Sequence, residues 1–238
     1  MVQVIGFDCD DTLWESESTF MLTQQRVREL LAHHVDPDVL ETQLYAVERA
    51  NLELYGYGAK AFTLSLIETA LELAGDALTA SDVRALLDAG KEILAHPVEL
   101  LAGAREAVEA AVDSGLRVVL ITKGDLFHQE SKVARSGFGE LVHAVDVIGE
   151  KDEATYSRIL RRHGVDPGDF VMIGNSLRSD VAPVLALGGW AAHVPHELTW
   201  ELEKVEDESV FDTHPRFRAM TSLAEVRPWV DELVGADG

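Results

Sequence analysis

The feature that most constrains this chain is a short apolar run that ends in a cluster of carboxylates. Residues 2–7, VQVIGF, are mostly apolar and rich in β-branched side chains, which is typical of a strand buried on both faces of a parallel sheet. Asp8, Asp10 and Asp11 follow directly. Like charges this close repel, so the cluster needs a cation or a proton to stabilise it. Because active sites of open α/β sheets lie at the carboxyl ends of strands, the position favours chemistry.

Two of these aspartates suit different steps of a phosphoryl transfer. Asp8, the first carboxylate after the predicted strand, could attack phosphorus and form an aspartyl-phosphate. Asp10 could protonate the leaving oxygen and then activate water. Mg²⁺ would neutralise the cluster and shield the phosphate from the attacking carboxylate. The alternative interpretation is a solvated acidic turn that caps a helix or loop beginning near Thr12.

Composition limits the classes of partner. The 238 residues include 20 Lys and Arg against 42 Asp and Glu, a formal net charge of −22. Nucleic acid and anionic membranes require a basic surface, so we expect neither as a partner. The single cysteine, Cys9, excludes an internal disulfide, and a small buried residue is the favoured interpretation over a reactive thiol. With no signal peptide and no apolar run near the ~20 residues of a membrane span, we expect a cytoplasmic protein, either a monomer or a homodimer.

A purely helical stretch follows the first strand. Between residues 15 and 96 apolar residues recur at helical spacing in four segments, and no strand pattern interrupts them. Gly75 ends the third segment and Pro97 follows the fourth. We therefore expect a helical domain of residues 15–96, inserted into a core domain made of residues 1–14 and 97–238.

After Pro97 the pattern changes to alternating strands and helices. Apolar runs typical of buried strands lie at residues 116–121, 142–148, 170–173 and 190–194, with helical segments between them. Repeated strand–helix units form right-handed crossovers, so the sequence predicts an α/β fold with a doubly wound, Rossmann-like parallel sheet. Near the end we expect an edge strand at 217–220 and a helix at 222–234, with Ser222 and Glu225 forming a capping box.

Polar residues gather where several predicted strands end or the next helix begins. A phosphate site needs a nucleophile, hydrogen-bond donors for the phosphoryl oxygens, a positive charge and oxygen ligands for Mg²⁺. Each residue alone has an ordinary explanation, such as a solvated lysine or an acid favoured by the helix dipole. Together they predict a site for phosphate chemistry, built from Asp8, Asp10, Thr122, Gly124, Lys151, Asn175 and Asp180; Lys123 could touch a substrate, but a surface role is favoured for it.

In this order the clusters resemble the motifs of the haloacid dehalogenase superfamily of phosphohydrolases. Residues 8–12 are similar to the first motif, 120–124 to the second, Lys151 to the third and 174–180 to the fourth, so the resemblance covers residues 1–14 and about 97–235. The helical insertion resembles the cap that such members carry between the first and second motifs. The resemblance implies catalytic roles for Asp8 (nucleophile), Asp10 (acid and base), Thr122 and Lys151; substrate binding by Thr122, Lys123, Gly124 and Lys151; and magnesium ligation by Asp8, Asp10, Asn175 and Asp180.

The function implied is that of a magnesium-dependent phosphatase that hydrolyses a small phosphorylated metabolite through an aspartyl-phosphate. Asn175 departs from the family pattern, which often has an acid there. An amide oxygen can ligate magnesium but brings no charge, so either Asn175 or Asp180 could be the direct ligand. Trp14 and the Tyr55–Gly58 loop are candidates for substrate selection, although such a loop is also typical of a turn between helices.

Three alternatives differ from this function. A phosphomutase uses the same catalytic groups, so the sequence does not separate it from a phosphatase. A dehalogenase has no use for an acid at Asp10 or for magnesium, which disfavours it. A catalytically idle binding protein on the same fold is disfavoured because all the matching polar groups are present.

Overall fold

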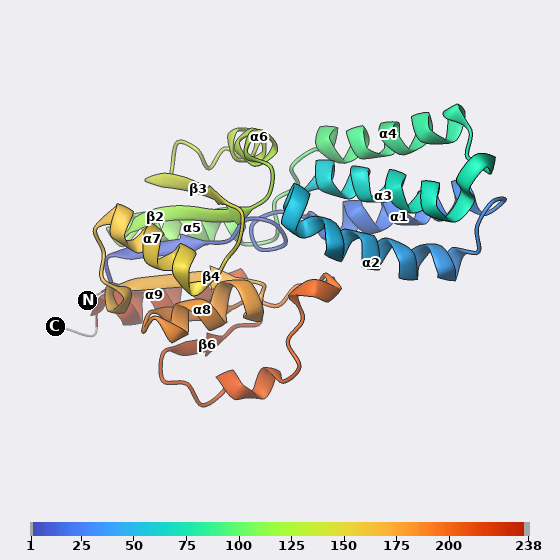
Figure 1. The fold of residues 1–238 in the computed structure, drawn as a ribbon. Helices are drawn as coiled ribbons and strands as arrows, with labels where there is room; N and C mark the ends of the chain where they lie inside the picture. Colours follow the sequence, from blue (N-terminus) through green and yellow to red (C-terminus); the bar gives the residue numbers. More distant parts are fainter. Residues whose placement is uncertain (1, 236–238) are drawn as a thin grey trace. The chain divides into compact units, whose positions relative to one another are not determined.

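The computed structural model describes residues 2–235 and separates into two compact units. The first contains Met1–Glu17, Val98–Lys123 and Gln129–Gly238, and the second contains Ser18–Pro97 and Gly124–His128. The chain thus leaves the first unit after its first strand and passes through the helical unit before returning (Figure 1). The short segment after Lys123 groups with the helical unit, which the sequence pattern did not indicate.

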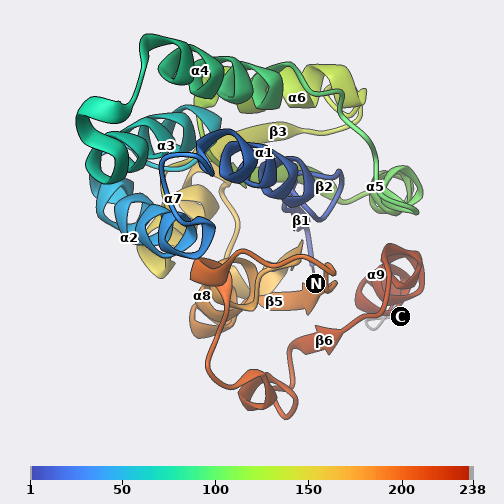
Figure 2. The same ribbon diagram turned by 90° about the vertical axis from the view of Figure 1, so that its right-hand side faces the viewer.

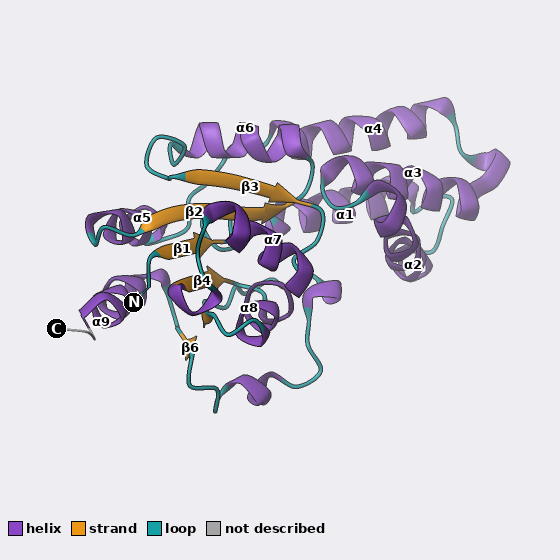
Figure 3. Cartoon of the chain, turned by 60° about the vertical axis from the view of Figure 1, so that its left-hand side comes forward, coloured by secondary structure: helices purple, strands orange, loops and turns teal. Residues whose placement is uncertain are grey.

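A six-stranded parallel sheet forms the centre of the first unit (Figure 3). This confirms the predicted doubly wound α/β fold, and the edge strand near residue 217 is present. The order β3-β2-β1-β4-β5-β6 places β1 between β2 and β4, so the chain winds outward in both directions from β1. The strands are β1 (Val4–Phe7), β2 (Arg117–Lys123), β3 (Ala144–Ile148), β4 (Phe170–Gly174), β5 (Trp190–His193) and β6 (Phe217–Ala219).

Side chains alternate between two cores because successive residues of a strand point to opposite faces. On one face Ile5 and Phe7 of β1 pack with α5 (Ala104–Asp113) and α9 (Val226–Gly235). On the other face, Val4 packs in a core with α7 (Glu153–His163) and α8 (Ala182–Ala186). Figure 2 views the same ribbon from another side, with β5, β6 and α9 labelled in the lower half of the view.

Close packing of β1 depends on the glycine at its third position. A Cβ added at Gly6 would lie 2.8 Å from the Phe170 ring and 2.9 Å from the Met172 sulfur, both on the neighbouring strand β4. A larger residue would therefore push against β4 in a densely packed core. The glycine keeps β1 in register with β4, and that register fixes where Asp8 leaves the sheet.

The helical segment after β4 is present, as a π-helical turn, η3 (Leu177–Val181), followed by α8. One local prediction near the carboxyl terminus is wrong. The capping box predicted at Ser222 does not form, because Ser222 makes no side-chain cap. Instead the Glu225 carboxylate accepts hydrogen bonds from the backbone N–H and the hydroxyl of Thr221, at 2.7 and 2.6 Å. A 3-10 turn at Leu223–Glu225 then leads into α9.

The second unit has the four predicted helices, which pack around one apolar core. Asp36 caps the second helix and Thr79 the fourth, where a complete capping box with Asp82 forms. Lys60 donates to both Asp125 oxygens, at 2.9 and 3.0 Å, and so ties the segment 124–128 to this unit. The helices are α1 (Glu17–Leu31), α2 (Pro37–Tyr55), α3 (Ala59–Ala74) and α4 (Ala80–Ala95).

Within residues 2–235, no helix is both long enough and apolar enough to cross a membrane.

Glu48 on α2 gives the helical unit a pH-dependent stability. Burial raises the pKa of Glu48 from 4.5 to about 7. The folded chain therefore keeps this proton up to about pH 7, whereas the unfolded chain loses it near 4.5. Stability from this group is complete below pH 4.5 and falls as the pH rises through 7, by at most about 3 kcal/mol.

We expect Glu48→Gln to stabilise the protein at pH 8 and to change little at pH 4.5, because the amide stays neutral at both. Urea denaturation of the full chain at the two pH values measures the difference. Glu53→Gln is the matched control, since Glu53 lies on the same helix and is exposed. An equal effect of the two substitutions at pH 8 would contradict the role of burial at Glu48.

Candidate active site

Asp8 leaves the sheet where the winding direction reverses, between β1 and β4. Its backbone N–H still pairs with the Ile173 carbonyl at 2.9 Å, so the position of the residue is fixed by the sheet. Its carboxylate is buried, 6% exposed. One oxygen, Oδ1, accepts a hydrogen bond from the Lys151 ammonium, and the other, Oδ2, accepts one from the Thr12 hydroxyl at 3.0 Å. Ligands of open α/β sheets bind at this kind of switch point.

Lys151 joins Asp8 to a second buried carboxylate. Its Nζ also donates to Oδ1 of Asp180 at 2.5 Å, and its side chain is only 2% exposed. Burial acts to lower the pKa of Lys151, but the charges of Asp180 and Asp8 outweigh it and raise this pKa well above its usual value. Lys151 is therefore a protonated bridge between two acids that come from different strand ends.

One lysine does not balance the acids around Asp8. Burial raises the pKa of Asp8 to about 7; Lys151 opposes the shift, and the charges of Asp180 and Asp10 add to it. The raised pKa therefore reflects burial first, and then the charges of Asp180 and Asp10, which the single lysine does not fully offset. A cation bound near Asp8 would lower this pKa.

The oxygen atoms around Asp8 fit a magnesium ion. Thr12 connects Asp8 to Asn175, because its hydroxyl contacts Asn175 Oδ1 at 3.2 Å and accepts the Asn175 backbone N–H at 3.0 Å. Asp180 is linked to Asp8 through Lys151. Carboxylate and amide oxygens, with no sulfur or imidazole among them, form the donor set that Mg²⁺ prefers.

Gly174 allows Asp180 to reach this position. A Cβ at residue 174 would lie 2.2 Å from Asp180 Oδ2 and 2.3 Å from its carboxyl carbon. Oδ2 also accepts the backbone N–H of Ser176 at 3.0 Å, so the carboxylate is held in the turn after β4. Any larger residue at 174 would displace it.

Asp10 lies in a different set of contacts from Asp8. Its Oδ1 accepts from the Trp14 indole N–H at 2.6 Å and from Lys132 Nζ at 2.5 Å, and its Oδ2 accepts from the Gln129 amide at 2.8 Å. Burial acts to raise the pKa of Asp10, but Lys132 and these hydrogen bonds lower it below its usual value. Both side-chain oxygens of Asp10 accept hydrogen bonds from protein donors, and none of these donors is shared with Asp8.

The same contacts revise the interpretation of Trp14. Its ring is fully buried and stacks near Phe138, with centroids 6.3 Å apart. A side chain in this position orients Asp10 and is not a surface for a substrate. The Tyr55–Gly58 loop belongs to the second unit, as a turn between α2 and α3.

The residues of the predicted phosphate-binding loop divide into three environments. Thr122 is 1% exposed, and its hydroxyl accepts from the Gln129 amide at 2.8 Å, so Gln129 links it to Asp10. Lys123 points instead toward Ser179 and Glu203. Gly124 has a φ of +132° and groups with the second unit. The structure thus links Thr122 to Asp10 but gives Lys123 other partners.

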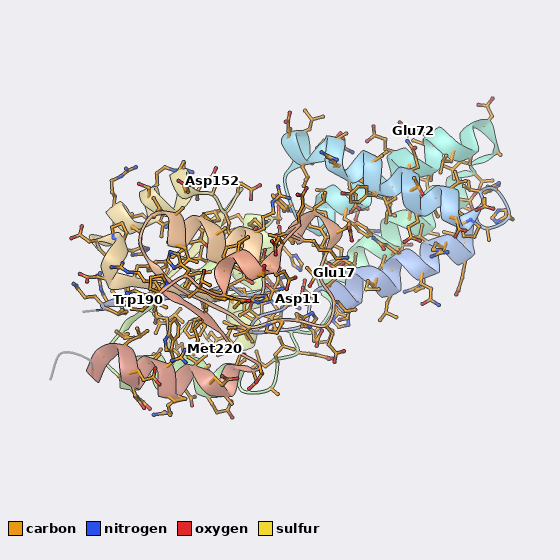
Figure 4. The ribbon with its side chains drawn as sticks, turned by 90° about the horizontal axis from the view of Figure 1, so that it is seen from below. Asp11, Glu17, Glu72, Asp152, Trp190 and Met220 are labelled. Carbon is orange, nitrogen blue, oxygen red and sulfur yellow. The ribbon has the colours of Figure 1, made fainter. Side chains whose placement is uncertain are left out.

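Asp11 fits the simpler interpretation of an acidic turn. Its Oδ1 accepts the backbone N–H groups of Ser16 and Glu17 at 2.8 and 3.0 Å, just where α1 begins (Figure 4). Burial raises its pKa to about 6, against the hydrogen bond from Glu17. Cys9 between the aspartates is fully buried, and burial raises the pKa of its thiol well above the usual value, so it packs as a small residue.

Sequence reasoning missed the partners of Asp10. Gln129 and Lys132 lie three residues apart on α6 (Leu126–Ser136), the helix that follows the predicted phosphate-binding strand. Residues at this spacing share one helix face. That spacing was a usable signal, but no residue type or motif marked this face as the one directed at Asp10.

Comparison with known proteins identifies the family. A family model described as haloacid dehalogenase-like hydrolase matches residues 2–188. A haloacid dehalogenase-like family hydrolase from Xanthomonas campestris, known from a crystal structure, is 41% identical; the similarity covers 100% of this chain and 95% of that one, with a TM-score of 0.86. No curated protein matches the chain.

More distant structures share the fold and differ in their described reactions. A 2-haloacid dehalogenase from Pseudomonas syringae is 20% identical, with 97% of this chain and 98% of that chain covered and a TM-score of 0.61. A putative HAD-hydrolase from Bacillus subtilis bound to magnesium is 13% identical, with coverages of 97% and 99% and a TM-score of 0.67. These two likenesses concern the fold alone. The family match over most of the length and the similarity to the Xanthomonas protein show that the chain belongs to the haloacid dehalogenase-like hydrolases.

Proposed function

We propose that this hydrolase is a magnesium-dependent phosphatase that removes the phosphoryl group from a small metabolite. The observation that carries the proposal is the separation of two neighbouring carboxylates. Asp8 is bound to Lys151 and Thr12, and Asp10 is bound to Lys132, Gln129 and Trp14. Two adjacent acids with different partners suit two different roles in one reaction.

Asp8 is the nucleophile in this proposal. Its carboxylate attacks phosphorus, the bond to the leaving oxygen breaks, and an aspartyl-phosphate forms. Lys151 keeps the carboxylate oriented and balances negative charge on the transferring group, and the hydroxyl of Thr122 donates to a phosphoryl oxygen. Both side chains are buried, so water does not weaken these interactions.

Asp10 serves the second step. Its lowered pKa keeps it ionised at neutral pH, which suits the removal of a proton from the water that hydrolyses the aspartyl-phosphate. In the first step Asp10 gives a proton to the leaving oxygen. Substrates with poor leaving groups therefore react with those enzyme molecules in which Asp10 is protonated. A dehalogenase would have no use for this residue or for its three donors.

Magnesium would be held by side-chain oxygens of Asp8, Asn175 and Asp180, with Asp10 as a further candidate ligand. When bound, the ion neutralises charge on the phosphoryl oxygens and on Asp8. The proposal includes both Asn175 and Asp180 as ligands, because Thr12 contacts the Asn175 amide oxygen and Lys151 links Asp180 to Asp8.

We expect hydrolysis of p-nitrophenyl phosphate to require Mg²⁺ and to stop when EDTA is added. The acids around Asp8 are poorly balanced without a cation, and a phosphate dianion would add to their charge. Release of nitrophenolate with and without metal measures the effect, and excess Mg²⁺ should restore it. Calcium should inhibit, because its looser coordination misplaces the carboxylate. Full turnover in metal-free buffer would contradict the proposal, as would chloride release from 2-chloropropionate without any phosphatase activity.

The two aspartates are separated by their effects on the phosphoryl-enzyme. Asp8→Asn should form no adduct. Asp10→Asn should slow turnover by about 10²- to 10⁴-fold. The step that expels nitrophenolate should be slowed less than hydrolysis of the phosphoryl-enzyme, so the phosphoryl-enzyme accumulates. Rapid quench followed by intact-protein mass spectrometry detects one added phosphoryl group. An adduct in Asp8→Asn would reverse the roles.

Gly174→Ala tests whether Asp180 supports the metal. The added methyl group displaces the Asp180 carboxylate, so we expect magnesium affinity to fall by about 10- to 100-fold. Titration calorimetry with Mg²⁺ measures it directly. Gly149→Ala is the control, because a Cβ there meets nothing within 4 Å and Gly149 lies two residues before Lys151. Equal affinities in the two variants would exclude Asp180 from the metal site.

A further inference from the structure

Three hydrogen-bond donors beside the candidate active site converge on one carboxylate of the same chain. The ammonium of Lys123 contacts Glu203 Oε1, and the hydroxyls of Ser176 and Ser179 donate to Glu203 Oε2 at 2.6 and 2.5 Å. Lys123 also donates to the Ser179 hydroxyl at 3.0 Å, which orients that hydroxyl toward the glutamate. We call Lys123, Ser176 and Ser179 the carboxylate cradle.

The cradle is built for an anion. Ser176 and Ser179 are 6% and 3% exposed, and the Lys123 side chain is 13% exposed. Burial acts to raise the pKa of Glu203, but Lys123 and the two serine hydroxyls lower it below its usual value. Charge-assisted hydrogen bonds to a buried carboxylate are the strong ones, and donors left without an acceptor there would be costly. The three donors of the cradle are therefore satisfied only when a carboxylate is bound to them.

The cradle adjoins the residues assigned to the phosphoryl group. Ser176 donates its backbone N–H to Asp180, which is bound to Lys151. The Tyr156 hydroxyl is buried and has no hydrogen-bond partner in the described chain, and it is close enough to both Asp180 and Glu203 for their charges to act on it. A ligand with two anionic ends could therefore place one at Asp8 and the other in the cradle.

Glu203 is supplied by a loosely packed segment. It lies in η4 (Glu201–Glu203), within the connection between β5 and β6. The adjoining apolar contacts come from Val205 and Phe211, both only partly buried, and Arg178 adds a hydrogen bond to the Leu202 carbonyl at 2.5 Å. Much of what fixes the segment is therefore the cradle itself, and such elements open most readily.

We propose that the cradle is a substrate subsite for a carboxylate, and that Glu203 occupies it until a substrate carrying both a phosphate and a carboxylate displaces it. The cradle as a carboxylate site stands on the contacts above. Its use by a substrate rests on the proposed phosphatase function. Glu203 would then select substrates, because a phosphate ester without a carboxylate leaves the glutamate in place.

The first test removes the occupant and offers a replacement. Sodium acetate should raise the melting temperature of Glu203→Ala by about 2–4 °C, with saturation, relative to sodium chloride of equal ionic strength. Wild type and Glu206→Ala should not respond, since Glu206 is exposed in the same segment. Adding Ser179→Ala to Glu203→Ala should abolish the response. The melting temperature can be measured without enzyme activity, so a response to acetate without phosphatase activity would support the cradle and refute the proposed function. A lack of response in a folded Glu203→Ala would overturn the cradle.

The second test uses the wild-type chain and so does not depend on a variant that folds. Phosphoglycolate and ethyl phosphate differ by a carboxylate in place of a methyl group. With Mg²⁺ present, saturating phosphoglycolate should increase hydrogen exchange of residues 197–206, and ethyl phosphate should not. Unchanged or slower exchange with phosphoglycolate, or no binding of it at millimolar concentration, would overturn displacement.

If both esters are hydrolysed, a third test compares how strongly the enzyme prefers one ester over the other. Glu203→Ala should raise the ratio of kcat/KM for phosphoglycolate over ethyl phosphate by about tenfold, the effect of one charged interaction of ordinary strength. Glu206→Ala should leave the ratio unchanged. An equal change for both esters would mean that Glu203 only anchors its segment.

Discussion

The site depends on one buried lysine between two buried carboxylates. Lys151 holds Asp8, which leaves β1, and Asp180, which follows β4, so one ammonium group links the two sides of the switch point. Burying charges in this way is costly unless each is paired and hydrogen-bonded, and removing one partner of such a group leaves a bare buried charge. Two acids against one base still leave an excess of negative charge, which a cation would balance.

The position of this group follows from the sheet. β1 is apolar on both faces and packs against β2 and β4, with Gly6 leaving room for the β4 side chains. The next residue that can turn out of the sheet is Asp8. Gly174 ends β4 at the same level and leaves room for the Asp180 carboxylate. Gly6 thus allows close packing of the two strands ahead of Asp8, and Gly174 leaves room for Asp180.

The sequence was sufficient for the parts of this arrangement that depend on strand ends. Short apolar runs locate β1, β2 and β4, and parallel strands end at one edge, which brings Asp8, Thr122 and Asn175 together; the family resemblance is confirmed. The partners from elsewhere were not predictable. Lys132 depends on the rotation of α6, and Glu203 depends on the path of an irregular connection, and neither leaves a periodic pattern in the sequence.

The lysines of the site are each matched to acids. Lys151 is bound to Asp8 and Asp180, Lys132 to Asp10, and Lys123 to Glu203. In a chain of net charge −22, an anionic substrate therefore meets cations that are already partly neutralised. The substrate gains a strong interaction in two ways: a metal ion adds positive charge beside Asp8, or an acidic side chain releases the lysine to which it is bound. Asp8, Asp10 and Asp180 are needed for the proposed chemistry. Glu203 takes no part in it, so Glu203 is the acid that can be displaced without the loss of a catalytic group.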